Sequence, residues 1–507
     1  MDRIIHLAGI LDEHQSKVSP EVYAMTTFTT VSADWQTTER VSKTTPSLQV
    51  AVNPFFRRGN IIGENAYKTL RELGTDYVRY IPWLPYPKLV VAELEPPTNT
   101  TTSWDFSLID PMTIDFFEAT NGHPVVLNFS TIPQWMWRTA KPVEYPANPN
   151  EATNSYTQGT EPRDPTFKEI AGYYARLLSW YTQGGFVDEI GRRHESGHHY
   201  SVPFWGVLNE PDIEHAMTPE IYTKLYDQVV LAMRKVQPDL KFVGMSLAYP
   251  SMNPRFFEYF LDRNNHEPGI PLDYIAYHFY AGPTPEESPE VHGYTFFNQA
   301  EKFLTTVRYV ENIRSRLSPE TRTMIGEIGA FHSQEAPWPP PVDATAPPIP
   351  DSHWYLSGAL YAYLFGELSR MGIDVVKASM LLAGEPRQHP ISLLDWTTGE
   401  PNPRFRVLQL LHHYFSAGDR IVALDQGRHH PYVYALPVVT KGGERRLLLV
   451  NKSQHPQKIH VPGSSGGQKV WVDQTTASAP PAIAKTTSDI IALEGYTVAA
   501  ITFPDRH

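Results

Sequence analysis

Short apolar runs alternate with amphipathic runs between about residue 48 and residue 416. The apolar runs are rich in β-branched and aromatic residues and lack polar alternation, which is typical of parallel strands buried on both faces. Segments 166–182 and 296–317 carry apolar residues at i, i+3, i+4 and i+7, so we expect both to be helices. The expected strands are 48–52, 76–80, 124–129, 203–208, 241–245, 273–278, 323–327 and 374–380.

Eight strand–helix units in series favour a closed parallel barrel over an open sheet. The fold class expected from the pattern is therefore α/β, a (β/α)8 TIM barrel over residues 47–417. The stretch is longer than the typical barrel of about 250 residues, and the surplus lies in the connections from strand to helix. Barrel enzymes carry their chemistry on that face.

The pattern changes after about residue 418, where short strand-like runs are separated by turns rich in Gly, Pro, Ser and Asn. It predicts an antiparallel β-sandwich over residues 418–507. Residues 1–46 have β character at 23–32 and are expected to join this sandwich. The expected sandwich strands are 421–424, 432–437, 445–450, 458–461, 469–473 and 496–503.

Composition restricts the possible partners of this 507-residue chain. Its 43 basic and 55 acidic side chains give a net charge of −12, which argues against nucleic acid or a membrane as the main partner. The absence of cysteine excludes disulfides and thiolate metal sites. The first residues lack the apolar stretch of a signal peptide, so we expect a cytoplasmic protein or a chain that begins after a removed signal.

Two glutamates stand at the ends of expected barrel strands. Glu210 ends an apolar run in the sequence Asn209-Glu210-Pro211, and Glu327 ends the run at 323–327. They belong to the fourth and seventh strands, which lie nearly opposite each other, so the two carboxylates can meet over the barrel centre. A pair of carboxylates about 5–5.5 Å apart is what a retaining glycosidase requires. Either glutamate alone would be read as a solvated or capping residue.

Several segments make this reading more specific. The Asn-Glu-Pro strand and the Glu327 strand resemble the acid/base and nucleophile motifs of the retaining (β/α)8 glycosidases. The remaining segments resemble glycoside hydrolase family 39, which is known for β-xylosidases and α-L-iduronidases. These are Val78-Arg79-Tyr80, residues 104–110, residues 128–136 and residues 273–280.

The resemblance implies roles for individual residues. Glu210 would be the acid/base and Glu327 the nucleophile, with the Glu210 pKa raised and Glu327 ionised through hydrogen bonds from Tyr280 or Arg79. Asn209 would donate to the sugar 2-hydroxyl, and His278 would contact a sugar hydroxyl or the acid/base. The other expected substrate-binding residues are Asn128 and the aromatic platforms Trp83, Trp135 and Trp396. Arg79, His278 and each tryptophan can also be read as structural core residues.

One departure from the family concerns the residues after the nucleophile. Ile328-Gly329-Ala330 stands where the family often has a bulky residue, so the wall beside Glu327 is expected to be unusual. The activity implied is β-xylosidase, with a carbohydrate as partner and no cofactor or metal. The alternatives are another glycosidase specificity (β-glucosidase, β-galactosidase or α-L-iduronidase-like) and a non-catalytic carbohydrate-binding barrel.

A zinc-protease pattern is also present. His194-Glu195-Ser196-Gly197-His198 matches His-Glu-x-x-His, whose chemistry requires both histidines one turn apart on a stable helix. The motif contains a glycine, has further glycines upstream and shows no apolar stripe. We therefore expect a solvated loop here and no zinc site.

Overall fold

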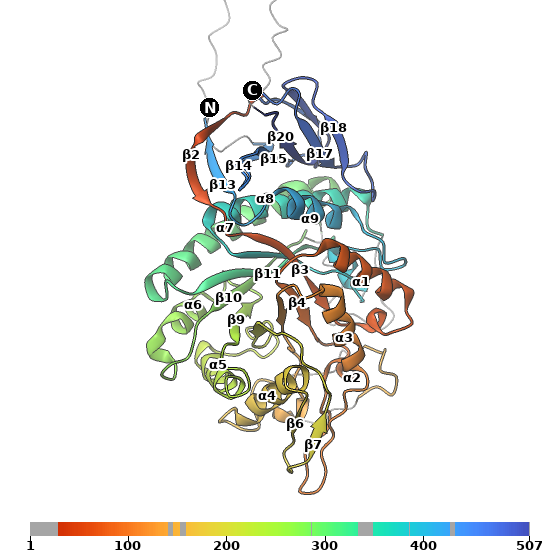
Figure 1. Cartoon of the computed structure of the whole chain (residues 1–507), viewed down its shortest axis with the longest axis vertical. Coiled ribbons are helices and arrows are strands. Elements are labelled where there is room, and N and C mark those ends of the chain that lie inside the picture. Colours follow the sequence, from red (N-terminus) through yellow and green to blue (C-terminus); the bar gives the residue numbers. More distant parts are fainter. Residues whose placement is uncertain are drawn as a thin grey trace, which may run out of the picture.

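The computed structural model describes residues 29–139, 145–152, 159–284, 286–332, 348–384, 386–425 and 431–505. Its centre is a closed barrel of parallel strands, and each expected barrel strand overlaps one of them. The α/β-barrel fold class is therefore confirmed (Figure 1). In barrel order the strands are β3 (Thr45–Ala51), β4 (Val78–Ile81), β5 (Val125–Leu127), β8 (Phe204–Gly206), β9 (Lys241–Leu247), β10 (Tyr274–Ala281), β11 (Arg322–Ala330) and β12 (Val375–Ala378).

Helices surround this barrel, and local sequence explains several of their ends. Asn60 accepts a hydrogen bond from the Ile62 amide at the start of α1, and Gly74 ends that helix with φ 59°. The expected helix 296–317 begins earlier, at His292. The helices are α1 (Ile61–Leu73), α2 (Pro87–Val90), α3 (Ile109–Thr120), α4 (Lys168–Thr182), α5 (Pro219–Met233), α6 (Pro254–Leu261), α7 (His292–Leu317), α8 (Asp351–Met371) and α9 (Pro403–Tyr414).

Two further sheets form the accessory sandwich at one end of the molecule (Figure 1). Its larger sheet has the order β18 (Ala482–Lys485), β17 (Gln468–Val472), β20 (Val498–Thr502), β15 (Arg445–Asn451), β14 (Val433–Val439), β13 (Arg420–Leu424) and β2 (Ala33–Val41). The smaller sheet has the order β1 (Thr29–Thr30), β16 (Gln457–His460) and β19 (Ile490–Leu493). Strands β18 and β19 were not expected from the sequence.

The N-terminal segment contributes to both sheets. β1 pairs with β16 and β2 pairs with β13, whereas most of the expected strand at 23–32 lies outside the described residues. β3 begins at Thr45, before the domain boundary expected at residue 47. A short loop therefore joins the sandwich to the first barrel strand.

Alternate side chains of β14 contact the sandwich core on one face and the barrel's core on the other. Val433 and Ala435 pack into the core between the two sheets, whereas Tyr434 and Leu436 belong to the large core shared with the barrel. Successive side chains of a strand point to opposite faces, so the larger sheet has two buried faces. Its second face lies against α8 and α9, and the barrel and the sandwich share one continuous apolar core.

The His-Glu-x-x-His segment is not helical: His194 and Glu195 belong to the second strand of a β-hairpin, and residues 196–198 form an irregular segment as expected. β6 (Gly185–Val187) pairs with β7 (Arg193–Glu195), which contains the first histidine. His194 Nε2 lies 2.9 Å from a carboxylate oxygen of Asp188, and His198 Nε2 lies 2.9 Å from one of Asp110. The two imidazoles are thus bound to different carboxylates, which does not match the arrangement of a zinc protease.

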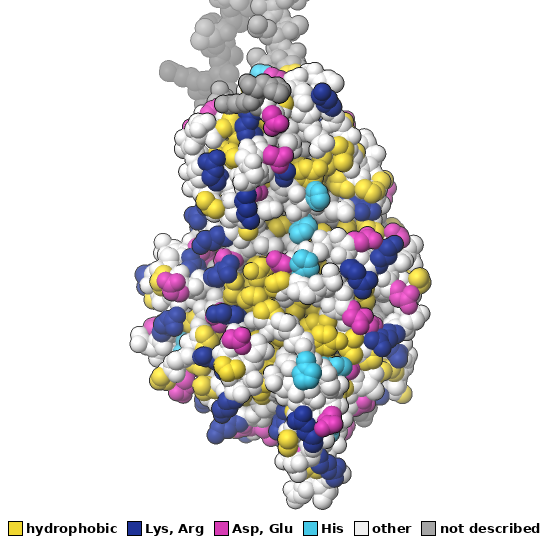
Figure 2. Space-filling model, in the orientation of Figure 1, with side chains coloured by type: hydrophobic (Ala, Val, Ile, Leu, Met, Phe, Trp, Pro, Cys, Tyr) yellow, Lys and Arg dark blue, Asp and Glu magenta, His cyan; other side chains and the backbone are white. Residues whose placement is uncertain are grey.

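Two observations concern the outer surface. In Figure 2 basic and acidic side chains are interspersed over the face in view, and neither sign gathers into a broad patch there. Within the described ranges, no helix is both long enough and apolar enough to cross a membrane.

Candidate active site

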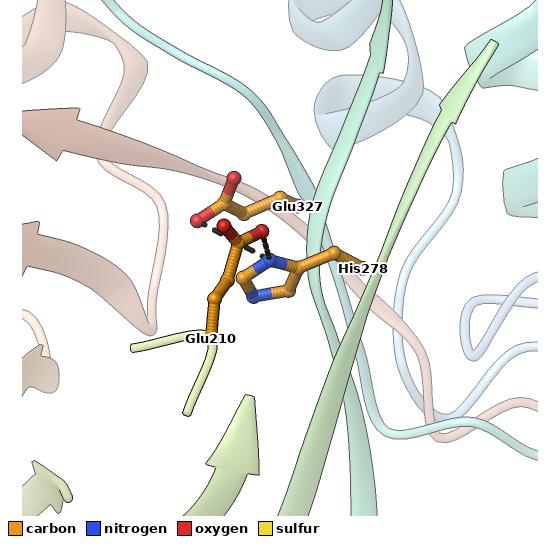
Figure 3. Close-up of side chains that lie close together, drawn as sticks. All are labelled: Glu210, His278 and Glu327. Carbon is orange, nitrogen blue, oxygen red and sulfur yellow. Dashed lines mark hydrogen bonds and ion pairs between the residues drawn. The ribbon is translucent and has the colours of Figure 1, made fainter. Parts of the chain in front are cut away.

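Three ionisable side chains meet at the mouth of the barrel (Figure 3). His278 and Glu327 are register partners on the adjacent strands β10 and β11, directly after a register shift that follows Tyr277. β-Bulges are common beside active sites, where they redirect side chains. Gly326 makes room for the imidazole, because a Cβ at this position would lie 2.9 Å from His278 Nε2.

Glu210 comes from the turn that follows β8. Its φ is 42° and that of Leu208 is 58°, both in the left-handed region that non-glycine residues rarely adopt. The Glu210 amide donates to the Ser246 carbonyl at 3.0 Å, which ties this turn to the end of β9. Such strained backbone persists where the surroundings fix it, and it is concentrated at functional sites.

The two glutamates lie close together, with the imidazole beside them. One carboxylate oxygen of Glu210, one of Glu327 and one ring nitrogen of His278 all lie within 4.8 Å of one another. His278 Nδ1 is 2.8 Å from Glu210 Oε1 and 3.6 Å from Glu327 Oε1. The expectation that the carboxylates converge over the barrel is therefore met by the geometry.

Arg79 is the central cation behind the site and is 3 % exposed. Its Nη1 donates to Glu327 Oε1 at 2.6 Å, and its Nη2 donates to Asn209 Oδ1 at 2.5 Å. Asn128 accepts from Arg79 Nε at 3.0 Å, and its own amide donates to the carbonyls of Gly206 and Leu208. Arg79 and Asn128 thus fix the positions of the residues that line the cavity.

A second hydrogen-bonded path reaches the other oxygen of Glu327. Arg79 Nη1 donates to Gln49 Oε1 at 3.0 Å, and Gln49 Nε2 donates to Ser379 Oγ at 2.9 Å. The Tyr280 hydroxyl donates to Glu327 Oε2 and lies 2.7 Å from Ser379 Oγ. Because Tyr280 gives its proton to Glu327, the Ser379 hydroxyl must donate to Tyr280. Every bond in this ring of five side chains therefore has a defined donor.

The two carboxylates have opposite pKa shifts. Burial and then the charge of Glu327 raise the pKa of Glu210 well above its ordinary value. Burial alone would also raise the pKa of Glu327, but the charge of His278 where that imidazole is protonated at low pH, the Arg79 guanidinium and the Tyr280 hydroxyl together lower it below the ordinary value. The site therefore holds one protonated and one ionised carboxyl group over a broad pH range.

His278 is neutral at this site, because burial lowers its pKa to about 4. Its Nε2 is buried without a hydrogen-bond partner among the described residues. A buried N–H without an acceptor is rarer than an unused lone pair, so the proton belongs on Nδ1. His278 therefore donates to Glu210 Oε1, which leaves Oε2 of Glu210 to carry the acid proton.

A cavity of about 840 Å³ opens above this group. Its lining includes six of the residues expected from the sequence: Trp83, Asn209, Glu210, His278, Tyr280 and Glu327. Arg79 and Asn128 are buried behind the lining. The sequence reasoning did not identify Gln49, Ser379 or Glu214. Gln49 and Ser379 are polar residues within or beside apolar strand runs, and that signal could have marked them.

Two of the expected aromatic platforms do not line this cavity. The Trp135 indole donates to the Glu93 carbonyl at 3.0 Å, and the Arg163 guanidinium lies over its ring at 4.5 Å. Trp396 stacks on His389 with ring centroids 3.8 Å apart. One face of each indole is thus already covered by a protein group.

The unusual wall beside Glu327 has a steric explanation. A Cβ at Gly329 would lie 2.6 Å from the Tyr280 ring and 3.0 Å from a methyl carbon of Ile391. The missing side chain is thus replaced by Tyr280, the residue that donates to Glu327. Glycine at this position allows the phenol to approach the carboxylate.

The same trio of Glu210, His278 and Glu327 offers donor atoms close enough to hold a metal ion. However, both oxygens of Glu327 already accept hydrogen bonds, one from Arg79 and one from Tyr280. A cation there would have to displace or repel the guanidinium. The donor set therefore fits a carboxylate pair better than a metal centre.

Comparisons with known proteins agree with the fold. A family 51 α-L-arabinofuranosidase from Bifidobacterium longum is 14 % identical with a TM-score of 0.62, covering 94 % of this chain and 99 % of that chain. A glucosidase from Croceicoccus marinus is 13 % identical with a TM-score of 0.59, covering 95 % and 99 %. A family 30 endoxylanase from Clostridium papyrosolvens C71 is 12 % identical with a TM-score of 0.56, covering 94 % and 100 %.

The comparison with curated proteins gives no match. Residues 187–346 match the model of a family described as glycosyl hydrolases family 39. This range includes both Glu210 and Glu327 together with the intervening strands β9 and β10. The family match thus confirms, over residues 187–346, the resemblance to glycosyl hydrolases family 39 that the sequence motifs indicated.

Proposed function

We propose that the protein is a retaining glycoside hydrolase in which Glu327 is the nucleophile and Glu210 the acid/base. The observation that carries the proposal is the proximity of two carboxyl groups whose oxygens lie within 4.8 Å and whose pKa values are shifted in opposite directions. This spacing is close to that of retaining enzymes and well below the 6.5–9.5 Å, roughly, of inverting ones.

The reaction would proceed in two displacements. Glu327 attacks the anomeric carbon while the bond to the leaving oxygen breaks and that oxygen takes the proton of Glu210. In the second step Glu210 accepts a proton from water as the water oxygen attacks the anomeric carbon and releases Glu327. Arg79 and Tyr280 hold the ionised nucleophile, and Asn209 donates to the sugar 2-hydroxyl.

The substrate proposed is a terminal β-xyloside. The motif resemblance to family 39 supports it, and one of the similar folds is an endoxylanase. A second candidate is a uronide, because Lys302 is among the residues that line the same cavity and its ammonium group could pair with a sugar carboxylate. The proposed binding partner is thus a carbohydrate, and we propose no binding to nucleic acid or to a membrane.

A panel of aryl glycosides tests this function, with β-xyloside, β-glucoside, β-galactoside and α-L-iduronide arms. Proton NMR of the first product formed should give the same anomer as the substrate. Net inversion would rule out double displacement, and sugar binding without turnover would favour the carbohydrate-binding barrel. Glu327→Gln, purified in the same way, is the control for contaminating glycosidases.

A further inference from the structure

We infer that Glu214 is a positioning residue that sets the contact between Asn209 and the sugar 2-hydroxyl. This inference rests on the proposed glycosidase function and assigns a third carboxylate of the cavity. Glu214 lines the cavity together with Glu210 and Glu327. Its amide donates to the Glu210 carbonyl at 2.8 Å, so the turn after the acid/base brings Glu214 back over the site.

One carboxylate oxygen of Glu214 connects two separate parts of the barrel rim. Oε1 accepts from Asn209 Nδ2 at 2.7 Å and from the Trp83 indole nitrogen at 2.7 Å. Trp83 follows β4, whereas Asn209 follows β8. Hydrogen bonds to a carboxylate are about twice as strong as neutral ones, so this bridge restrains both side chains.

The bridge determines how the Asn209 amide is presented. Oδ1 accepts from Arg79 Nη2 at 2.5 Å, which fixes which end of the amide is the donor. Nδ2 then gives one of its two protons to Glu214 and keeps the other for a substrate hydroxyl. Without Glu214 the amide would be held only at its oxygen end and could rotate out of line. Small misplacements of a group that contacts the transition state reduce rates strongly.

The carboxylate could also act in a different way, as a negative charge near the oxocarbenium-like transition state. The two roles predict different dependences on the substrate. A positional role through Asn209 requires a 2-hydroxyl on the sugar, whereas a charge effect does not. A 2-deoxy substrate therefore distinguishes them.

The experiment compares wild type, Glu214→Ala and Glu214→Gln on an aryl β-glycoside and on its 2-deoxy analogue. We expect Glu214→Ala to lower kcat/KM about 10- to 100-fold on the 2-hydroxy substrate, and less than about threefold on the 2-deoxy one. Glu214→Gln keeps an acceptor oxygen and should recover part of the loss. The double variant with Asn209→Ala should be no slower than Asn209→Ala alone.

Glu258→Gln is the matched control, because this exposed glutamate on α6 bonds only to Tyr309 at 3.2 Å among the interactions described. Equal losses on both substrates, or additive losses in the double variant, would overturn the inference and leave the glycosidase function intact. A wild-type protein without turnover on any glycoside would instead overturn the proposed function. If Glu214→Ala does not fold, Glu214→Gln and the Asn209→Ala cycle still decide the matter.

Discussion

His278 Nδ1 makes its hydrogen bond with Glu210, at 2.8 Å, although its register partner on the neighbouring strand is Glu327. A neutral imidazole that donates to Glu210 leaves the other carboxylate to Arg79 and Tyr280. The two glutamates therefore have different surroundings: burial and the charge of Glu327 raise the pKa of Glu210, whereas Arg79 and Tyr280 stabilise the ionised form of Glu327.

The pH dependence of kcat/KM should be bell-shaped. Activity rises with pH as Glu327 ionises, and this limb lies below the ordinary carboxyl range because its pKa is lowered. Activity falls with pH as Glu210 loses its proton, and this limb lies well above that range because its pKa is raised. Glu210→Gln should abolish the alkaline limb on a substrate with an activated leaving group. An unchanged alkaline limb in that variant would assign the acid to another residue.

A small anion should restore turnover to a variant that lacks the nucleophile. Glu327→Gly should lose about 10³-fold or more in turnover, because no covalent intermediate can form. Azide can then occupy the space of the lost carboxylate and should give a glycosyl azide of the opposite anomeric configuration. Glu210→Gly with azide is the matched control, which should give the retained configuration. The products are distinguished by NMR, and an exchanged pattern would reverse the two assignments.

Substitutions in the hydrogen-bond ring around Glu327 should lower kcat less as their distance from Glu327 increases. Tyr280→Phe removes the proton donated to Oε2, which should move the acidic limb of the pH profile upward and lower kcat by about 10- to 100-fold. Ser379→Ala removes a donor one step further away and should cost less than tenfold. The measurement is the pH profile of both variants. A larger loss for Ser379→Ala than for Tyr280→Phe would contradict the direction of bonding assigned here.

A buried lysine beneath the site should reduce stability at low pH. Lys377 is 1 % exposed, with Nζ 3.1 Å from the Met324 sulfur, and burial lowers its pKa well below 10.5. The unfolded chain holds a proton that the folded chain releases, so stability rises with pH between the lowered pKa and about 10.5. Lys377→Met should therefore raise Tm most at pH 5 and least near pH 10.

Lys68→Met, on the exposed face of α1, is the matched control for this titration and should leave Tm nearly unchanged across the range. A gain from Lys377→Met that does not vary with pH would mean that the lysine gains or loses no proton on folding.

Metal removal should leave the activity unchanged. Both Glu327 oxygens are occupied by Arg79 and Tyr280, and His194 and His198 bind separate carboxylates. Turnover after dialysis against a chelator should equal that of the untreated protein, with or without added zinc. Recovery of lost activity by zinc would require a different account of the site.

The barrel was predictable because its strands carry dense apolar runs between turn signals, and this pattern alone identified all of them. β18 and β19 were not predicted, since β18 follows the prolines at 480 and 481 and both strands are short runs near the edges of their sheets. Glu210 was predictable because it follows such a run, and Glu327 because it is a carboxylate within one, although β11 continues beyond it to Ala330. The sequence could not show that Trp83 lines the cavity whereas Trp135 and Trp396 do not, because the surroundings of an indole depend on how the loops pack. Glu214 has no local signal, and only the fold of its turn brings it to Asn209.

Segments that precede and follow the barrel in the chain are built into one sheet, in which β2 pairs with β13. Excising the barrel would separate β2 from β13 and would leave β13 as an open sheet edge prone to self-association. It would also remove the larger sheet from α8 and α9 and expose the apolar side chains of these helices. Protein engineers should therefore graft new specificity onto the rim loops and retain the whole scaffold, since the barrel is not a transplantable module.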